Sequence, residues 1–342
     1  MTKPEDERHT QAEGGRSLPQ EGDAHQRPEA PRQSETRRKK EAHSEAEGRA
    51  EGNVSERDPS LRLFDLHCHL DFAENARELA AGLAQRGIGA LSVTVTPAGY
   101  VRAAALFAPC ANVHTALGLH PWWVADGRCG EADVARFERL AAKARFVGEV
   151  GLDFAPAHAS TRETQLAAFE RVARACADAE RDGRAATPPP HSIPLPATPE
   201  RDGRRVLSLH AVRAAGAVLD VLERTGAAQA CTCVFHWFSG TAGELQRALG
   251  LGCLFSINPR MLATKRGRAY ARALPPDRLL LETDLPAQGA GRADAADMES
   301  ALQGALCELA SLRGEDCGGL AERLARTGAR ILALPHAVPQ PR

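Results

Sequence analysis

The chain has 342 residues, with 43 Lys and Arg against 44 Asp and Glu and a formal net charge of −1. This balance excludes a polycation that binds nucleic acid through bulk charge, so any binding of a polyanion must come from a local patch or from bound metal. No apolar run reaches the length of a membrane span, and the nine cysteines are scattered without a C-x-x-C pair. We therefore expect a cytoplasmic protein with reduced thiols and no membrane contact.

Composition divides the chain into segments of different kinds. Residues 1–60 carry only three large aliphatic or aromatic side chains against 11 Lys and Arg and 14 Asp and Glu. Such a segment cannot bury enough apolar surface to offset the entropy of ordering it, so we expect a disordered charged tail. Residues 61–337 have the composition of a globular domain, interrupted at 183–204 by a Pro-rich stretch that is typical of an extended, exposed insertion.

From residue 61 onward, short apolar runs alternate with helical patterns. Strand-like runs occupy residues 61–66, 89–95, 112–118, 145–150, 205–210, 230–236, 252–257 and 278–283. Helical periods occupy residues 75–86, 131–144, 161–182, 212–224, 242–249, 295–312 and 319–334. Eight strands, each followed by a helix or a helical loop, predict an α/β fold whose parallel sheet closes into a (β/α)8 TIM barrel. The alternative is a doubly wound open sheet, although no glycine-rich phosphate loop follows the first strand.

Six residues with metal-binding side chains lie where these strands end. They are His67, His69, Glu149, His210, His236 and Asp284. His67 and His69 are two apart on the first strand and therefore point to the same side. Each residue alone has a structural explanation, since a histidine at a strand end often caps a helix and an aspartate there is often an N-cap. All six at one rim of one barrel, where TIM-barrel active sites are built, instead indicate a metal site.

Four histidines and two carboxylates are more ligands than one ion needs. A carboxylate between two sets of ligands suits two divalent ions about 3.5–4 Å apart, which would hold a phosphoryl oxygen, activate a water molecule and stabilise the leaving oxygen. Imidazole ligands favour Zn²⁺, Mn²⁺ or Fe²⁺ in intrinsic affinity, whereas the abundance of Mg²⁺ can override this preference. The cofactors that we expect are therefore two divalent ions of Mg, Mn or Zn.

Six motifs, in this order and spacing, resemble the TatD family of metal-dependent deoxyribonucleases. They are HCHLD (67–71), GLHP (118–121), GEVGLDF (148–154), LSLH (207–210), HWFSG (236–240) and LLLETDLP (279–286). The resemblance implies a metal-dependent hydrolase that cleaves DNA phosphodiester bonds on a TIM barrel, with Glu149 and Asp284 as catalytic residues. It further implies that His67, His69 and Asp284 hold one metal. The second metal would be held by His210 and His236, and Glu149 would bridge the two.

Within the family, HWFSGT (236–241) and GCLFSINPRM (252–261) are most similar to QatD, the TatD-type nuclease of the Qat anti-phage system. This finer resemblance implies a bacterial defence operon, with Qat-system proteins as partners. The chain also departs from the common family pattern. Trp122 and Trp123 stand where many relatives have a second histidine, and Arg213 lies three residues after His210 instead of two. These departures leave every ligand in place and put the preferred substrate in doubt.

Five further residues are candidates for supporting the ligands or contacting the substrate. They are Asp153, Arg213, Trp237, Arg260 and Lys265. Asp153, four residues beyond Glu149, is placed to orient a ligand histidine. The tryptophans at the rim either stack on unpaired bases or pack over the barrel mouth. The basic residues after the seventh strand either contact phosphates or begin a solvated helix.

Three functions of different classes fit this sequence. The first is a nuclease that acts on single-stranded DNA or on ends, since unpaired nucleotides reach a site at the barrel rim more easily. The second is an amidohydrolase or lactonase, because one scaffold hosts many chemistries. Those enzymes often bridge their metals with a modified lysine, whereas the fourth strand here supplies Glu149. The third is a subunit of a defence complex whose activity depends on its partners.

Overall fold

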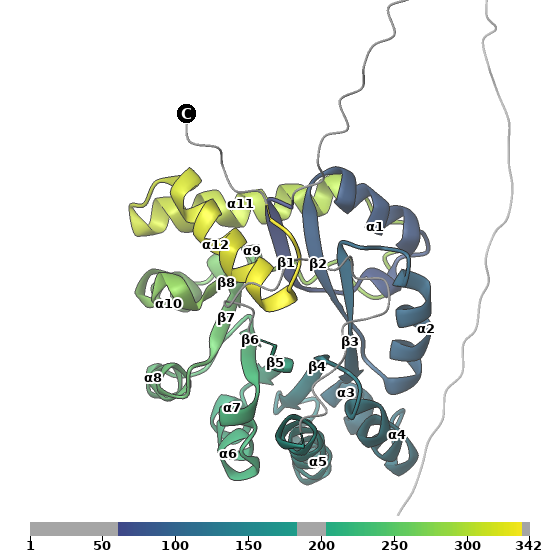
Figure 1. Ribbon diagram of the computed structural model, residues 1–342. Coiled ribbons are helices and arrows are strands. Elements are labelled where there is room, and N and C mark those ends of the chain that lie inside the picture. The colour runs from purple at the N-terminus through teal and green to yellow at the C-terminus, as the bar shows by residue number, and fades with distance from the viewer. Residues whose placement is uncertain (1–60, 183–202, 337–342) are drawn as a thin grey trace, which may run out of the picture. The chain divides into compact units, whose positions relative to one another are not determined.

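Eight parallel strands, paired in the order β1 to β8, form the centre of the computed structural model, which describes residues 61–182 and 203–336 (Figure 1). They are β1 (Leu63–Cys68), β2 (Ile88–Val93), β3 (Val113–Leu119), β4 (Phe146–Asp153), β5 (Val206–Val212), β6 (Thr232–His236), β7 (Leu254–Ile257) and β8 (Leu279–Leu281). Neighbours in the sheet are also neighbours in the sequence, which a doubly wound sheet does not allow. The predicted (β/α)8 barrel is therefore confirmed. The predicted tail, and the predicted insertion up to residue 202, lie outside the described residues.

Backbone hydrogen bonds between β1 and the segment after β8 nearly close the barrel. The N–H of Asp284 donates to the carbonyl oxygen of His67 at 2.9 Å, and the N–H of His69 donates to the carbonyl oxygen of Leu285 at 2.8 Å. The two ends of the sheet are therefore joined at the height of the predicted ligands. Three of those ligands consequently lie side by side, although they come from opposite ends of the domain sequence: His67, His69 and Asp284.

Helices follow the strands and surround the barrel (Figure 1). The longer ones are α1 (Ala76–Gln85), α2 (Pro97–Phe107), α4 (Glu131–Ala141), α5 (Arg162–Arg181), α6 (Ala215–Thr225), α8 (Ala242–Gly250), α10 (Lys265–Ala273), α11 (Ala295–Arg313) and α12 (Cys317–Leu332). Short helices are α3 (Pro121–Ala125), α7 (Ala227–Ala230) and α9 (Pro259–Leu262), with 3-10 turns at Leu70–Phe72, Ala159–Thr161 and Pro276–Arg278. All predicted helices are present, with ends that differ by at most three residues. In the part of the chain that the structure describes, no helix combines the length and the apolarity needed to cross a membrane.

Helix α2 is not anticipated by the hydrophobic pattern. It begins in an ordinary way, because the Thr96 side chain accepts a hydrogen bond from the N–H of Gly99 at 2.9 Å and Pro97 occupies the first helical position. Its buried residues include only two beyond the first turn, Ala103 and Phe107. With so few large buried side chains, the helix shows little of the hydrophobic periodicity by which amphipathic helices are recognised.

Apolar side chains fill the interior of the barrel at the end opposite the predicted ligands. Inward-facing residues of the strands form one buried cluster with α12, which consists of Leu61, Phe64, Leu66, Leu91, Val93, Ala116, Phe146, Val206, Val234, Leu254, Leu280, Ala325, Ala329, Ile331, Leu332 and Leu334. The contact is close, since a Cβ added at Gly328 of α12 would lie 2.7 Å from the Cβ of Phe64. With this end filled, the carboxyl-terminal mouth remains for polar side chains.

Strands β4 and β5 continue beyond their predicted ends. The prediction that Glu149 and His210 end their strands is wrong, because the pairing of β4 with β5 extends to Asp153 and Val212. At this height the two strands lie close together. Gly151 has a φ of 140°, and a Cβ there would lie only 2.1 Å from the carbonyl oxygen of His210. The close approach places the side chains of β4 and β5 in direct contact at the barrel mouth.

Candidate metal centre

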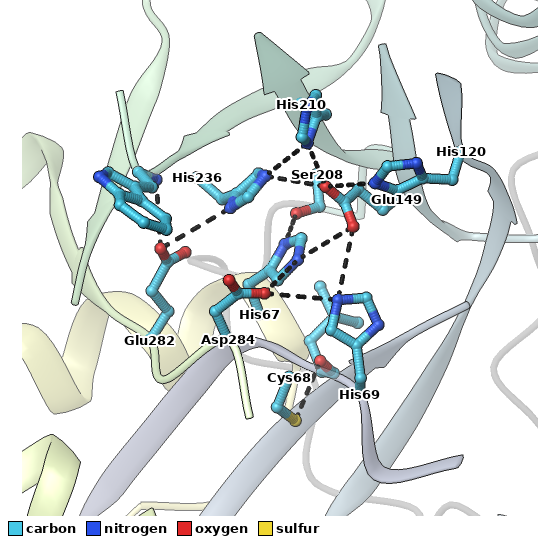
Figure 2. Close-up of polar contacts among 12 residues, drawn as sticks. His67, Cys68, His69, His120, Glu149, Ser208, His210, His236, Glu282 and Asp284 are labelled. Carbon is cyan, nitrogen blue, oxygen red and sulfur yellow. Dashed lines mark hydrogen bonds and ion pairs between the residues drawn. The ribbon is translucent and has the colours of Figure 1, made fainter. Parts of the chain in front are cut away.

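Seven polar side chains converge at the carboxyl-terminal mouth of the barrel (Figure 2). Six are the predicted ligands and the seventh follows β3, so the group consists of His67, His69, His120, Glu149, His210, His236 and Asp284. All are buried except Asp284, which is half-buried. All but His67 line a pocket of about 580 Å³. The structure thus brings the six predicted ligands together at one site.

The carboxylate of Glu149 lies at the centre of this group. Its Oε2 atom faces Nε2 of His67 at 3.5 Å and Nε2 of His69 at 3.4 Å. Its Oε1 atom faces Nδ1 of His210 at 2.6 Å and Nε2 of His236 at 2.9 Å. Burial alone would raise the pKa of Glu149, but the surrounding histidines outweigh it and hold that pKa well below its usual range. The carboxylate is therefore an anion shared between two pairs of histidines.

Asp284 completes the side of the site formed by His67 and His69. Its Oδ1 atom lies 3.7 Å from Nε2 of His67 and 3.4 Å from Nε2 of His69, while its Oδ2 atom lies 3.3 Å from a guanidinium nitrogen of Arg260. Burial raises the pKa of Asp284, but the hydrogen bond to His69 and the nearby His67 outweigh it and lower the pKa to about 2. Its φ of 58° is a left-handed conformation that costs energy for a non-glycine residue and is most often kept at functional sites.

Hydrogen bonds at the far ring nitrogens determine how two histidines face the carboxylates. Nε2 of His210 lies 3.0 Å from Oδ2 of Asp153, so the neutral ring carries its hydrogen there and turns the Nδ1 lone pair toward Glu149. Nδ1 of His67 lies 2.7 Å from Oγ of Ser208, which leaves Nε2 for the carboxylates. That Nε2 atom is buried and has no hydrogen-bond partner among the described residues. Lone pairs of buried imidazoles aimed at shared carboxylates fit a divalent cation.

His120 has the opposite arrangement. Its Nδ1 atom caps α3 by accepting a hydrogen bond from the N–H of Trp122 at 3.1 Å. The neutral ring therefore carries its hydrogen on Nε2, which lies 3.2 Å from Oε1 of Glu149. Burial lowers the pKa of His120 to about 4, so the ring is neutral at physiological pH. His120 lies within ligand distance of the others, but a ring that donates from Nε2 offers no lone pair to a metal there.

His120 and Glu282 are functional candidates that are not among the predicted site residues, although both lie within the motifs GLHP (118–121) and LLLETDLP (279–286). The buried carboxylate of Glu282 accepts hydrogen bonds from the N–H of Trp237 (3.1 Å), from Nδ2 of Asn258 (2.7 Å) and from the hydroxyl of Ser256. It thereby ties together the ends of β6, β7 and β8. Their positions in the sequence could have indicated a role at the barrel mouth. His120 follows the third apolar run, and Glu282 is a charged residue directly after the run LLL.

The five further candidates occupy different places. Asp153 lies against a predicted ligand histidine, and Trp237 and Arg260 line the pocket, with the Arg260 guanidinium 5.7 Å from the centre of the Trp237 ring. Lys265 is exposed as the first residue of α10, directly after a residue that lines the pocket. Arg213 is exposed, has a φ of 52° and does not line the pocket. The structure therefore brings three of these five residues to the site and leaves Arg213 apart from it.

We expect protons and metal to compete for this site. Burial lowers the pKa of His69, but Asp284 and Glu149 outweigh it and raise the pKa to about 10. In the same way, burial lowers the pKa of His210 while Asp153 and Glu149 raise it to about 9. In the metal-free protein both rings hold an extra proton at neutral pH, which a metal must displace.

Metal affinity should therefore increase as the pH rises toward these values. Calorimetry in buffers of different ionisation enthalpy should detect the release of about two protons at neutral pH, and binding without proton release would contradict the expectation.

A (β/α)8 barrel with histidines and carboxylates gathered at its carboxyl-terminal mouth has the architecture of a metal-dependent hydrolase. The sequence model of the family described as TatD related DNase matches residues 64–181 and 201–332, well over half of the chain. The chain therefore belongs to the TatD family. The predicted family is thus confirmed, and with it the predicted enzyme class, a hydrolase of the deoxyribonuclease type. The finer resemblance to QatD stays a prediction.

Relatives and solved structures agree with this membership. The chain is 27% identical over 242 residues to the putative deoxyribonuclease TATDN3 of Mus musculus, which is 67% of this chain and 74% of the mouse protein. It is 25% identical over 240 residues to the human deoxyribonuclease TATDN3, with 66% and 79% of the two chains covered. A shorter stretch of 109 residues is 35% identical to the 3'-5' ssDNA/RNA exonuclease TatD of Erwinia tasmaniensis, covering 30% and 42%. The crystal structure of YJJV, a TatD homologue of Escherichia coli, has the same fold, with a TM-score of 0.63 at 22% identity over 80% of this chain and 99% of that one.

Proposed function

We propose that this protein hydrolyses phosphodiester bonds of DNA with two divalent metal ions and that it acts on single strands or ends. The observation that carries the proposal is the position of Glu149, whose Oε2 atom faces His67 and His69. Its Oε1 atom faces His210 and His236, besides the donor His120. A buried anion between two sets of ligands suits two ions better than one. Glu149 would bind both ions, and the other ligands would divide into His67, His69 and Asp284 for one ion and His210 and His236 for the other.

When bound, the ions would act as Lewis acids on a phosphate oxygen and lower the pKa of a water molecule. The side chains around them would bind and orient the substrate. Arg260, at the pocket wall beside Asp284, is placed to hold a phosphate oxygen through its guanidinium. His120 supplies a neutral N–H donor on the opposite side of the site. Phe72 lines the pocket and stacks on His69, with ring centroids 4.7 Å apart.

Replacement of His120 should slow turnover without removing metal. Because Nε2 of His120 donates a hydrogen, His120→Ala should retain the metal content of the wild type and lower turnover by about 100-fold, the usual effect of losing one well-placed donor. His120→Gln keeps an N–H donor and should retain more activity. His236→Ala is the matched control, since it should lose metal. Metal analysis and turnover of a short chromogenic phosphodiester test this, and loss of metal from His120→Ala would show that His120 is a ligand.

The shape of the site supports unpaired DNA as the substrate. All of the predicted ligands except His67 line a pocket of about 580 Å³. It is also lined by Trp122, from α3, and by Trp237, which follows β6. A phosphate within a duplex is flanked by the paired strand, so a single strand or a frayed end enters such a pocket more easily. The Erwinia relative is named a 3'-5' ssDNA/RNA exonuclease, which makes RNA the alternative. Cleavage rates on single-stranded DNA, blunt-ended duplex DNA and single-stranded RNA of the same sequence decide between DNA and RNA as the substrate. Preferred cleavage inside a duplex would contradict the proposal.

Lys265→Ala should weaken the binding of long single strands and leave metal content unchanged. Each phosphate contact that is lost lowers the slope of log K against log salt by roughly one unit. Arg268→Ala is the matched control, because Arg268 lies further along α10 and pairs with Glu308. Titrations of a labelled strand at several salt concentrations measure the slopes, and equal slopes for wild type and Lys265→Ala would exclude Lys265 from the DNA interface. Arg260→Ala should in addition slow turnover, since Arg260 contacts Asp284.

An amidohydrolase or lactonase is the second candidate. Glu149 occupies the position between the two ligand groups, and the described residues that line the pocket include no lysine for a modified bridge. This observation favours the nuclease. An assay of the metal-loaded protein on DNA, a short phosphodiester, an amide and a lactone separates the two. Hydrolysis of the amide or lactone alone would replace the nuclease proposal with the second candidate.

The setting that we propose is bacterial anti-phage defence in the cytoplasm, together with Qat-system proteins. It rests on the motifs at residues 236–241 and 252–261, where the chain resembles QatD. In a second form of this proposal the activity depends on partner proteins, and the isolated chain hydrolyses little DNA. Phage plating on cells that carry the chain with and without its neighbouring genes tests the setting, and undiminished plaque formation with the complete set would exclude it.

A further inference from the structure

We infer that Trp122 is a stacking platform for an unpaired base of the substrate, anchored by Asp153 at a fixed position relative to the metal centre. The inference rests on the proposed function, because it states how that site would recognise an unpaired nucleotide. Trp122 is 41% exposed, and among the described residues only Trp122 and Val101 are large apolar side chains with this exposure. Unlike Val101, Trp122 lines the pocket that contains the predicted ligands.

The Trp122 ring is held in one orientation although it is exposed. Its Nε1–H donates to Oδ2 of Asp153 at 2.6 Å, and its backbone N–H donates to His120 at 3.1 Å. The ring also stacks against His158, with centroids 5.7 Å apart and planes inclined by 24°. A surface side chain without a ligand gains little from such fixation. For a stacking platform, fixation is useful because less conformational entropy is lost when a base binds.

Asp153 connects this platform to the metal centre. The same Oδ2 atom that accepts from Trp122 lies 3.0 Å from Nε2 of His210. The backbone of Asp153 is held on both sides by Gln165, which accepts from its N–H at 2.8 Å and donates to its carbonyl oxygen at 2.9 Å. A base on Trp122 would therefore be kept at a constant distance from His210. Asp153 is the positioning residue of this arrangement.

The other two tryptophans are accounted for by packing. Trp123 is 8% exposed, and the guanidinium of Arg128 covers its ring at 3.9 Å from the centroid. Trp237 is half-buried and packs against the hydrophobic core. The sequence leaves two roles open for the rim tryptophans, stacking on bases or packing over the barrel mouth. Trp123 and Trp237 have the packing role. The exposed, anchored ring of Trp122 is the one that suits stacking.

Binding of a labelled single-stranded oligonucleotide in EDTA tests the platform apart from turnover. Trp122→Ala should bind it about 5- to 150-fold more weakly than wild type, the range observed for loss of one base–aromatic stack. An oligonucleotide of the same length whose sugars carry no bases should bind both proteins equally. Trp122→Phe keeps a ring but loses the donor to Asp153, so its affinity should fall between the two. Val101→Ala removes the other exposed large apolar side chain, which does not line the pocket, and is the matched control.

Failure of this inference can be told apart from failure of the proposed function. Equal affinity of wild type and Trp122→Ala for the normal oligonucleotide would exclude the platform, whatever the enzyme hydrolyses. A loss of affinity that is the same for the base-free oligonucleotide would also exclude it, because the contact would then be with the backbone. Equal binding by Trp122→Phe and wild type would exclude the anchoring role of Asp153. If the metal-loaded wild type cleaved no oligonucleotide while the affinities followed the expected order, the nuclease proposal would fall and the platform would stand.

Discussion

Glu149→Gln should keep its fold and lose turnover by at least about a thousandfold. Glutamine has the shape of glutamate, so the buried site is filled as before, but the anion shared by the two pairs of histidines is gone. Stabilisation of transition-state charge by bound metal is worth several kcal/mol, and each 1.36 kcal/mol is tenfold in rate. Because Glu149 contacts histidines on both sides, its neutralisation should weaken both of the proposed metal sites together.

The control and the readouts separate this effect from general damage. Glu138→Gln also removes one carboxylate, from an α4 side chain whose oxygen lies 2.7 Å from Arg171, and should behave as wild type. Metal content, thermal stability and turnover of a short phosphodiester should be measured for both variants. Loss of turnover with reduced metal and an intact fold is the expected result for Glu149→Gln. Near-normal turnover with unchanged metal content would reject Glu149 as the bridge.

The fold and the predicted ligands could be read from the sequence because both follow short-range regularities. Buried strands of a parallel barrel are continuous apolar runs, and each is separated from the next by a helical period. Active-site residues of such a barrel gather at the carboxyl ends of its strands. Polar residues that end or directly follow these runs, such as His236 and Asp284, therefore fall at one mouth whatever the details of the packing.

The remaining features depend on contacts between distant residues. The anchoring of Trp122 needs Asp153, which is 31 residues away. The pairing that carries β4 and β5 past their predicted ends depends on both strands together. Neither hydrophobic periodicity nor spacing contains this information. The closure of the barrel is predictable, but for the same reason the contact between Asp65 and Thr283, 218 residues apart, that joins its two ends is not.

Asp65→Ala should destabilise the protein by about 2–4 kcal/mol, since it removes a hydrogen-bond acceptor that joins β1 to the segment after β8, where the barrel closes. The carboxylate of Asp65 is fully buried and accepts hydrogen bonds from the hydroxyl (2.6 Å) and N–H (3.1 Å) of Thr283 and from the N–H of His67 (3.2 Å). Without it these buried donors lose their partner. Asp65→Asn keeps an acceptor oxygen of the same shape and should retain most of the stability.

The pH dependence of the Asp65→Asn variant gives a sharper test of the same contact. Burial raises the pKa of Asp65 from 3.8 to about 7 in spite of its hydrogen bonds. An acid whose pKa is raised by folding contributes stability that is present below its unfolded pKa and is lost as the pH rises through its folded pKa. Wild type should therefore lose on the order of 2 kcal/mol relative to Asp65→Asn between about pH 5 and pH 8. The histidines and carboxylates of the metal centre are common to both proteins, so their titration largely cancels in the difference. Urea unfolding of the two metal-free proteins at both pH values measures this difference in unfolding free energy. A difference that does not change with pH would show that Asp65 is ionised in the folded protein throughout this range.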